Sequence, residues 1–394
     1  MTEAQVAQSV EQRTENPRVG GSIPPLGTIL SRFPFSPAMG GMFGGDKAEW
    51  TDRAMAENDF AAFIQDGEKY ALVGLNGPLK PHIPSGKVGA KLWVRTDAQF
   101  KVPENWRALL GSYRTSEVEN CNLFLISKEA SSALDVLNEE NEILRQRVWE
   151  FYVGLLLASR FATTQHPVTF TGSRRGGEID IRRQEDLERA IPSIIPPGFP
   201  AIAYDEVQCA ARLAENIEKL ATARIRGGHW RLFRTLEVYV KARANASLID
   251  RIHQYCRCIE GMILPDPGKT KQQFKSRSEL FIESGHHDLM GALYDIRSAV
   301  EHLHESKYLE NCDRNERLEL ARKEAIAEYI ARNILARVIG HKALWKHFAN
   351  TSALKKFWTL PKEDRRAIWG NPIDPLEPVA AFNPEDIPNR MLGL

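Results

Sequence analysis

The spacing of apolar residues differs between the two halves of the chain. In the first half, short apolar runs bounded by Gly and Pro signals have the length and composition of β-strands. These runs are Tyr70–Val73, Lys91–Arg95, Cys121–Ile126, Val168–Thr171 and Glu178–Arg182. The last two flank a Gly-rich turn and predict a β-hairpin. Apolar residues at helical spacing predict one helix over about 132–161, and an Ala-rich stretch predicts another over 46–66.

A proline-rich segment, 192–203, separates this region from a second half that has helical periodicity throughout. Helices are predicted at about 204–222, 229–244, 247–263, 270–283, 287–305 and 313–348. We therefore expect an α+β protein, in which a mixed α/β domain at 46–191 precedes an all-α helical bundle at 204–348. The tail, 349–394, is expected to pack as a strap or to form a short helical turn near 362–368.

The first 45 residues have a different character. Residues 5–29 lack apolar periodicity, and Gly21-Ser-Ile-Pro24 can be encoded as GGTTCGATTCC, which resembles the T-arm of a transfer-RNA gene. The segment thus resembles a translated tRNA gene, and Met39, Met42 or Met55 is then the expected start. An ordinary disordered leader is the alternative, because the Pro and Gly content also permits it.

Composition excludes several classes of protein. The 52 Lys and Arg residues balance 51 Asp and Glu residues, so nucleic-acid binding would require a local basic patch. The longest apolar run, Val153–Ser159, is too short to span a bilayer, and no signal-peptide layout is present. The five cysteines do not have zinc-ligand spacing. We expect a cytoplasmic protein with reduced thiols, no membrane contact, no metal and no cofactor.

The strongest candidate for chemistry is the run Arg297-Ser-Ala-Val-Glu-His302 in the predicted helix 287–305. Arginine binds phosphate with two parallel hydrogen bonds, and histidine exchanges protons near neutral pH. At about 100° per residue, a straight helix places His302 roughly 140° from Arg297 and His304 only about 20° away. Helical geometry alone therefore favours His304, unless the helix ends near His302. An ordinary Arg297–Glu301 ion pair is the non-catalytic alternative.

The segment from Leu293 to His302 resembles the signature of the HEPN superfamily, and more narrowly that of its Apea-like branch. The matching feature is an aromatic-Asp-aliphatic-Arg-Ser run that is followed by a histidine. The resemblance covers about 205–345 and includes the helices around Phe233 and Phe274. This family often has Gly after the histidine, where this chain has Leu303.

The resemblance implies a metal-independent endoribonuclease with an Arg-x4-6-His site, often in a homodimer, and a role in prokaryotic anti-phage defence or toxin-like growth arrest. Arg297 would bind the scissile phosphate of RNA. His302, or His304 at the upper spacing limit, would act as general acid or base for attack by the ribose 2′-hydroxyl. A non-catalytic module that binds RNA or a partner protein is the alternative. The resemblance does not say which ligand or partner the N-terminal domain binds.

A second candidate feature lies at the start of the predicted helix 229–244, where arginines cluster beside Trp230 and Phe233. These arginines are Arg224, Arg226, Arg231 and Arg234. Such a mixture can follow an RNA backbone and stack a base. A helix start with solvated arginines and core aromatic residues is the alternative interpretation.

Overall fold

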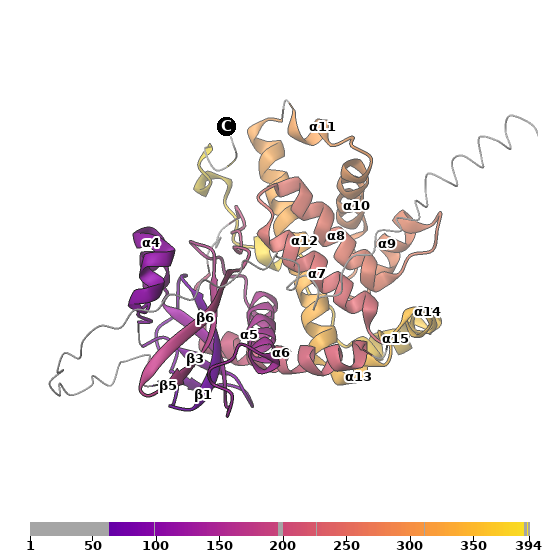
Figure 1. The fold of residues 1–394 in the computed structure, drawn as a ribbon. Helices are drawn as coiled ribbons and strands as arrows, with labels where there is room; N and C mark the ends of the chain where they lie inside the picture. Colours follow the sequence, from indigo (N-terminus) through magenta and orange to yellow (C-terminus); the bar gives the residue numbers. More distant parts are fainter. Residues whose placement is uncertain are drawn as a thin grey trace, which may run out of the picture. The chain divides into compact units, whose positions relative to one another are not determined.

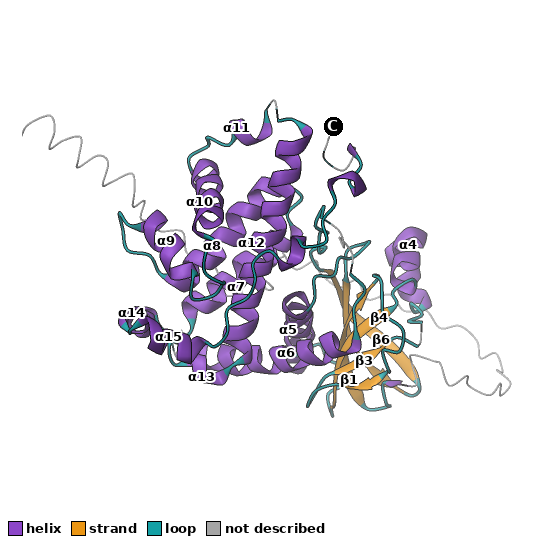
Figure 2. Ribbon diagram, turned by 180° about the vertical axis from the view of Figure 1, so that it is seen from behind, coloured by secondary structure: helices purple, strands orange, loops and turns teal. Residues whose placement is uncertain are grey.

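A computed structural model of the chain describes residues 63–97, 99–195, 200–225, 227–310, 312–389 and 392. The leader at 1–45, nearly all of the predicted helix at 46–66, and Arg226 lie outside the described residues. The described residues all lie in one compact unit, Met55–Leu394. This unit combines an antiparallel sheet with a large set of helices (Figures 1 and 2), so the expected α+β character is confirmed.

Six strands within the described residues form one sheet in the order β2-β3-β4-β1-β5-β6. Every neighbouring pair is antiparallel. The bounds are Glu68–Leu75 for β1, Gly86–Lys87 for β2, Trp93–Arg95 for β3, Leu123–Ala130 for β4, Val168–Arg175 for β5 and Glu178–Asp186 for β6. All five predicted strands are confirmed, and so is the hairpin, which β5 and β6 form.

Helices cover both faces of this sheet, on opposite sides in Figure 1. Helix α5 (Glu139–Ala158) packs on β1, β4 and β5, where Asn141 donates a hydrogen bond of 3.1 Å to the Thr171 hydroxyl. Tyr70 and Phe170 lie in a cluster on the other face, with Trp106 of helix α4 (Glu104–Glu119) packed against them. The alternation of β-strand side chains thus provides two separate cores.

Helix α5 confirms the predicted helix, but it begins at 139 rather than 132. Asn138 is its N-cap and accepts a hydrogen bond from the Glu140 backbone N–H at 3.1 Å. Helix α4 was not predicted, because Gly111 interrupts it with non-helical dihedral angles and large apolar residues on it face solvent. Leu109 is 72% exposed and Tyr113 is 78% exposed, so no clean apolar stripe marks the helix.

Helix α5 also packs closely against α6 (Tyr204–Arg224), the first helix of the second half. At the crossing, a Cβ atom built on Gly154 would lie 2.3 Å from the Ala210 carbonyl oxygen, so only glycine fits there. The proline-rich segment between the two halves is packed as well. Ser193 is buried, and its hydroxyl donates a hydrogen bond of 2.9 Å to Glu324.

The second half is helical as expected. The helices after α6 are α7 (Trp230–Ala244), α8 (Leu248–Ile263), α9 (Thr270–Ser278), α10 (His287–Glu301), α11 (Ser306–Leu309), α12 (Arg314–Gly340), α13 (Lys342–Trp345), α14 (Thr351–Thr359) and α15 (Lys362–Trp369). Helix α8 contacts α7, α10 and α12, so it lies at the centre of this group (Figure 2).

Three predicted helices end earlier than expected. Helix α9 stops at Ser278 because the backbone of Phe281 and Glu283 pairs with Ile373 from the far end of the chain. Helix α10 stops at Glu301, and α12 stops at Gly340 because His341 is extended. The C-terminal segment packs along α12 as a strap, where Arg314 and Arg317 bind carbonyl oxygens of Ile387 and Leu392. The predicted turn near 362–368 is helix α15.

Candidate active site

Helix α10 ends at the histidine of the candidate motif. His302 is its C-cap, and the backbone N–H groups of Leu303 and His304 donate to the carbonyls of Val300 and Ala299 at 3.2 and 2.7 Å. This pair of bonds is the Schellman arrangement, in which the residue after the cap is left-handed. Leu303 has a φ of 56°, in the position that glycine usually occupies. The helical path therefore ends at His302, and the straight-helix position of His304 beside Arg297 no longer applies.

Arg297 lies on α10 and is held by a carboxylate from α8. Its Nε and Nη2 atoms lie 3.2 and 3.1 Å from Glu260 Oε2, and its guanidinium carbon lies 5.9 Å from the centre of the Tyr294 ring. Burial raises the pKa of Glu260, while the charge of Arg297 opposes that rise. The alternative of an Arg297–Glu301 ion pair is wrong, because Arg297 pairs with Glu260 and Glu301 pairs with another residue.

The partner of Glu301 is His253 of α8, whose Nε2 lies 2.8 Å from Glu301 Oε2. His253 is buried, and this desolvation lowers the pKa of its imidazole although Glu301 opposes the shift. Burial alone would raise the pKa of Glu301, but the His253 hydrogen bond and the nearby Arg297 charge bring it below its ordinary value. This second cross-helix contact ties the last turn of α10 to α8.

The two candidate acid–base groups, His302 and His304, are exposed and lie next to this anchored turn. Their ring centres are 6.4 Å apart. Neither imidazole makes a hydrogen bond or ion pair with any residue that the structure describes, so both are free to meet a substrate. The structure thus leaves both histidines as candidates, as the sequence did.

A further cation on α8 went unnoticed in the sequence. His253, Arg257 and Glu260 are spaced by four and three residues, so they share one face of the helix. Arg257 is exposed between its two anchored neighbours and has no ion-pair partner among the described residues. Its charge still lowers the pKa of Glu260 and Glu301. The spacing of these three ionisable residues along the helix was the available signal.

Two arginines of the predicted cluster share one carboxylate. Arg234 and Arg224 lie 3.1 and 3.9 Å from the two oxygens of Glu237, and Arg224 also lies over the Phe233 ring at 5.2 Å. Burial lowers the pKa of Arg231. Among the described residues, no contact joins this cluster to Arg297, and α8 presents a different face to α7 than to α10. The cluster and the motif are therefore separate features.

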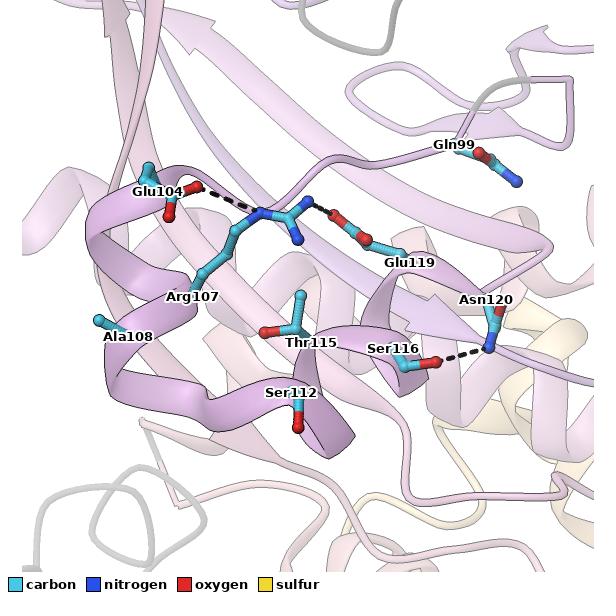
Figure 3. A pocket seen from close by; sticks show the side chains of 9 residues that line it. All are labelled: Gln99, Glu104, Arg107, Ala108, Ser112, Thr115, Ser116, Glu119 and Asn120. Atoms are coloured by element: carbon cyan, nitrogen blue, oxygen red, sulfur yellow. Dashed lines mark hydrogen bonds and ion pairs between the residues drawn. The ribbon is translucent and has the colours of Figure 1, made fainter.

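A pocket of about 620 Å³ lies at the bend of α4 (Figure 3). Arg107 pairs there with Glu119 and lies 3.7 Å from Glu104, while Asn120 donates a hydrogen bond of 3.2 Å to Ser116. No histidine lines this pocket, and its arginine is bound by carboxylates on both sides. It therefore offers no arrangement for acid–base cleavage of a phosphodiester.

Within the described part of the chain, no three or more His, Cys, Asp or Glu side chains are grouped as metal ligands. Each helix there is also too short or too polar to span a bilayer. None of the five cysteines forms a disulfide. When the chain is compared with models of protein families, with curated proteins and with solved structures, none gives a significant match.

Proposed function

We propose that this chain is a metal-independent endoribonuclease of the HEPN type that uses Arg297 and His302. One observation carries the proposal: α10 ends at His302, so an exposed imidazole follows directly after a turn that carries an anchored arginine. The two cross-helix pairs, Arg297–Glu260 and Glu301–His253, fix that turn on α8. A preorganised cation beside an acid–base group is what cleavage of a phosphodiester requires.

In this proposal the ribose 2′-hydroxyl attacks the adjacent phosphorus and loses its proton to an imidazole. The bond from phosphorus to the 5′-oxygen breaks, a second acid–base group returns a proton to that oxygen, and a 2′,3′-cyclic phosphate remains. Arg297 stabilises the charge that builds up on the phosphoryl oxygens. Proton transfer of this kind contributes typically about 10²–10⁴-fold to the rate.

Glu260 determines how Arg297 meets the substrate. Glu260 uses Nε and Nη2 of the guanidinium, and Nη1 makes no hydrogen bond within the described residues. A phosphate can bind Nη1 directly or displace the carboxylate. Arg257, exposed on the same face of α8, is placed to receive a neighbouring phosphate of the RNA backbone.

The proposal includes a homodimer, because the reaction needs two acid–base groups and the exposed histidines of one chain both lie on a single turn. Leu303 is 83% exposed between His302 and His304, and a second copy of the chain would cover it. The facing motif would then supply the second acid–base group. Light scattering on the purified chain tests this point directly, with Leu303→Asp expected to shift the mass toward that of a monomer.

A second candidate function follows from the Arg297–Glu260 pair itself. An arginine that is paired with a largely buried carboxylate can serve packing alone. The helical half would then be a non-catalytic module that binds RNA or a partner protein.

Cleavage of total RNA in the presence of EDTA separates the two functions. The wild-type chain and the controls Arg212→Ala and His166→Ala, which remove exposed residues elsewhere, should cleave. Arg297→Ala and His302→Ala should be inactive. His304→Ala is tested beside them. If His304→Ala is inactive while His302→Ala still cleaves, His304 is the acid–base group instead of His302. If the wild type and all variants bind RNA but none of them cleaves it, the result supports the non-catalytic module.

A further inference from the structure

A basic pocket lies between α9, α14 and α15, apart from the Arg297 motif. Its volume is about 370 Å³, within the size range of small-ligand sites. Four cationic side chains and one carboxylate line it, together with a tryptophan. These residues are Arg277, Glu279, Trp358, Lys362, Arg365 and Arg366.

The arginines of this pocket are held mainly by neutral groups. Arg366 donates to the backbone carbonyls of Leu280 and Glu279 at 3.0 and 2.6 Å. Arg365 donates to the carbonyls of Trp358 and Leu360 at 2.7 and 2.9 Å. Carbonyl oxygens orient a guanidinium but do not cancel its charge.

The acidic groups at the pocket are too few to balance these cations. Arg277 lies 3.4 Å from Asp266, and Lys362 lies 3.5 Å from Glu279. Glu279 also holds His287, 2.5 Å from its other oxygen.

Like charges are crowded together around the tryptophan. Arg277 and Arg365 each place the guanidinium carbon 5.4 Å from the Trp358 ring centre. Burial lowers the pKa of Arg277, Asp266 opposes this, and the neighbouring Arg365 lowers it further. The same like-charge effect links Arg366 to Arg337, whose pKa is lowered by burial and by Arg366. A bound anion would relieve this repulsion.

We propose that this pocket binds phosphate groups, with Lys362, Arg365 and Arg277 as the contacts. The site goes beyond the proposed cleavage chemistry and does not depend on it. Trp358 is only 7% exposed and is already covered by two guanidinium groups, so it supports the arginines and does not stack a base. The phosphates can belong to a free nucleotide or to the backbone of RNA.

Calorimetric titration of the full chain at constant ionic strength tests the site. The probes are pyrophosphate and a 2′-O-methyl RNA of twelve nucleotides, which cannot be cleaved through a 2′-hydroxyl. Lys362→Glu is the main variant, because this side chain is 67% exposed and its loss should not disturb folding. Lys356→Glu is the matched control, an exposed lysine on α14 outside the pocket. Arg365→Gln is the second variant, and thermal unfolding checks that it still folds.

We expect the Lys362-dependent binding of pyrophosphate to be equal in the wild type, Lys356→Glu and Arg297→Ala. Lys362→Glu and Arg365→Gln should weaken binding by roughly tenfold, which corresponds to about 1.4 kcal/mol. A matching loss for the RNA probe assigns the site to the RNA backbone, and a loss for pyrophosphate alone assigns it to a free phosphate ligand. The proposal is overturned if neither probe binds, or if Lys362→Glu binds as well as Lys356→Glu. Because Arg297→Ala removes the proposed cleavage site and leaves this pocket intact, it tests phosphate binding independently of the nuclease proposal.

Discussion

Arg297 and Glu260 form a cross-helix pair in which two guanidinium nitrogens, Nε and Nη2, approach one carboxylate oxygen at 3.2 and 3.1 Å. The two side chains are 18% and 13% exposed, so water screens the pair only in part. The remaining Glu260 oxygen, Oε1, is buried without a hydrogen-bond partner in the part of the chain described. Under the proposed function, an incoming phosphate would therefore compete with Glu260 for the same cation.

Glu260→Gln should strengthen RNA binding. The amide keeps the shape of the side chain but removes the negative charge that opposes a phosphate, and we expect the Kd to fall about fivefold, or roughly 1 kcal/mol. Fluorescence anisotropy with a labelled 2′-O-methyl RNA measures this, with the exposed Glu139→Gln as control. If Glu260→Gln weakens binding as much as Arg297→Ala does, Glu260 orients the arginine and does not compete with the phosphate.

Leu303→Gly should stabilise the fold. Leu303 has a left-handed φ of 56°, which costs an ordinary L-residue about 1–2 kcal/mol and costs glycine almost nothing. We expect the free energy of unfolding of the monomer to rise by about 1 kcal/mol in urea denaturation. Leu303→Ala keeps the backbone penalty and should change stability little. Equal gains from both variants would show that the exposed side chain, and not the backbone, carries the cost.

Glu150 should make stability fall as the pH rises. Burial raises its pKa to about 8, and the charge of Glu218 adds to the rise, while a hydrogen bond from Gln146 opposes it. The folded chain thus holds this proton more tightly than the unfolded chain, for which the ordinary value is 4.5. The contribution of Glu150 to the free energy of unfolding is complete below pH 4.5, and it is lost as the pH rises to about 8.

Urea denaturation between pH 5 and pH 8 measures this effect. Relative to wild type, Glu150→Gln should remove a slope of at most about 1.4 kcal/mol per pH unit. Glu139→Gln changes an exposed carboxylate on the same helix and should leave the slope unchanged. An identical slope for wild type and Glu150→Gln would mean that Glu150 is already ionised at pH 5.

Gly154→Ala should destabilise the contact between α5 and α6. The added Cβ would meet the Ala210 carbonyl oxygen at 2.3 Å, and two helix backbones must separate to admit it. We expect a loss of about 1–3 kcal/mol in the free energy of unfolding. Gly340→Ala is the control, because its Cβ would meet only Leu213 at 3.6 Å. That control should be neutral or stabilising by up to about 1 kcal/mol. Similar effects of the two variants would contradict a tight crossing at Gly154.

The strands and most of the helices could be predicted because each depends on residues close together in the chain. The hairpin of β5 and β6 follows from its Gly-rich turn, and the helices of the second half follow from apolar spacing. Helix α4 could not be predicted, because Gly111 and its exposed apolar residues break the pattern. The end of α9 depends on Ile373, which lies far along the sequence.

In the candidate site, too, local features could be predicted from the sequence and long-range contacts could not. The sequence by itself placed Arg297 and His302 on one helix and supplied the residue types that phosphodiester cleavage needs. Only the tertiary structure decided that Arg297 pairs with Glu260 and Glu301 with His253, because these partners come from α8, 37 and 48 residues away. It also decided that α10 ends at His302, since Leu303 takes a left-handed conformation that its own propensity disfavours. Local spacing determines which face a side chain occupies, whereas packing between helices determines what that side chain meets.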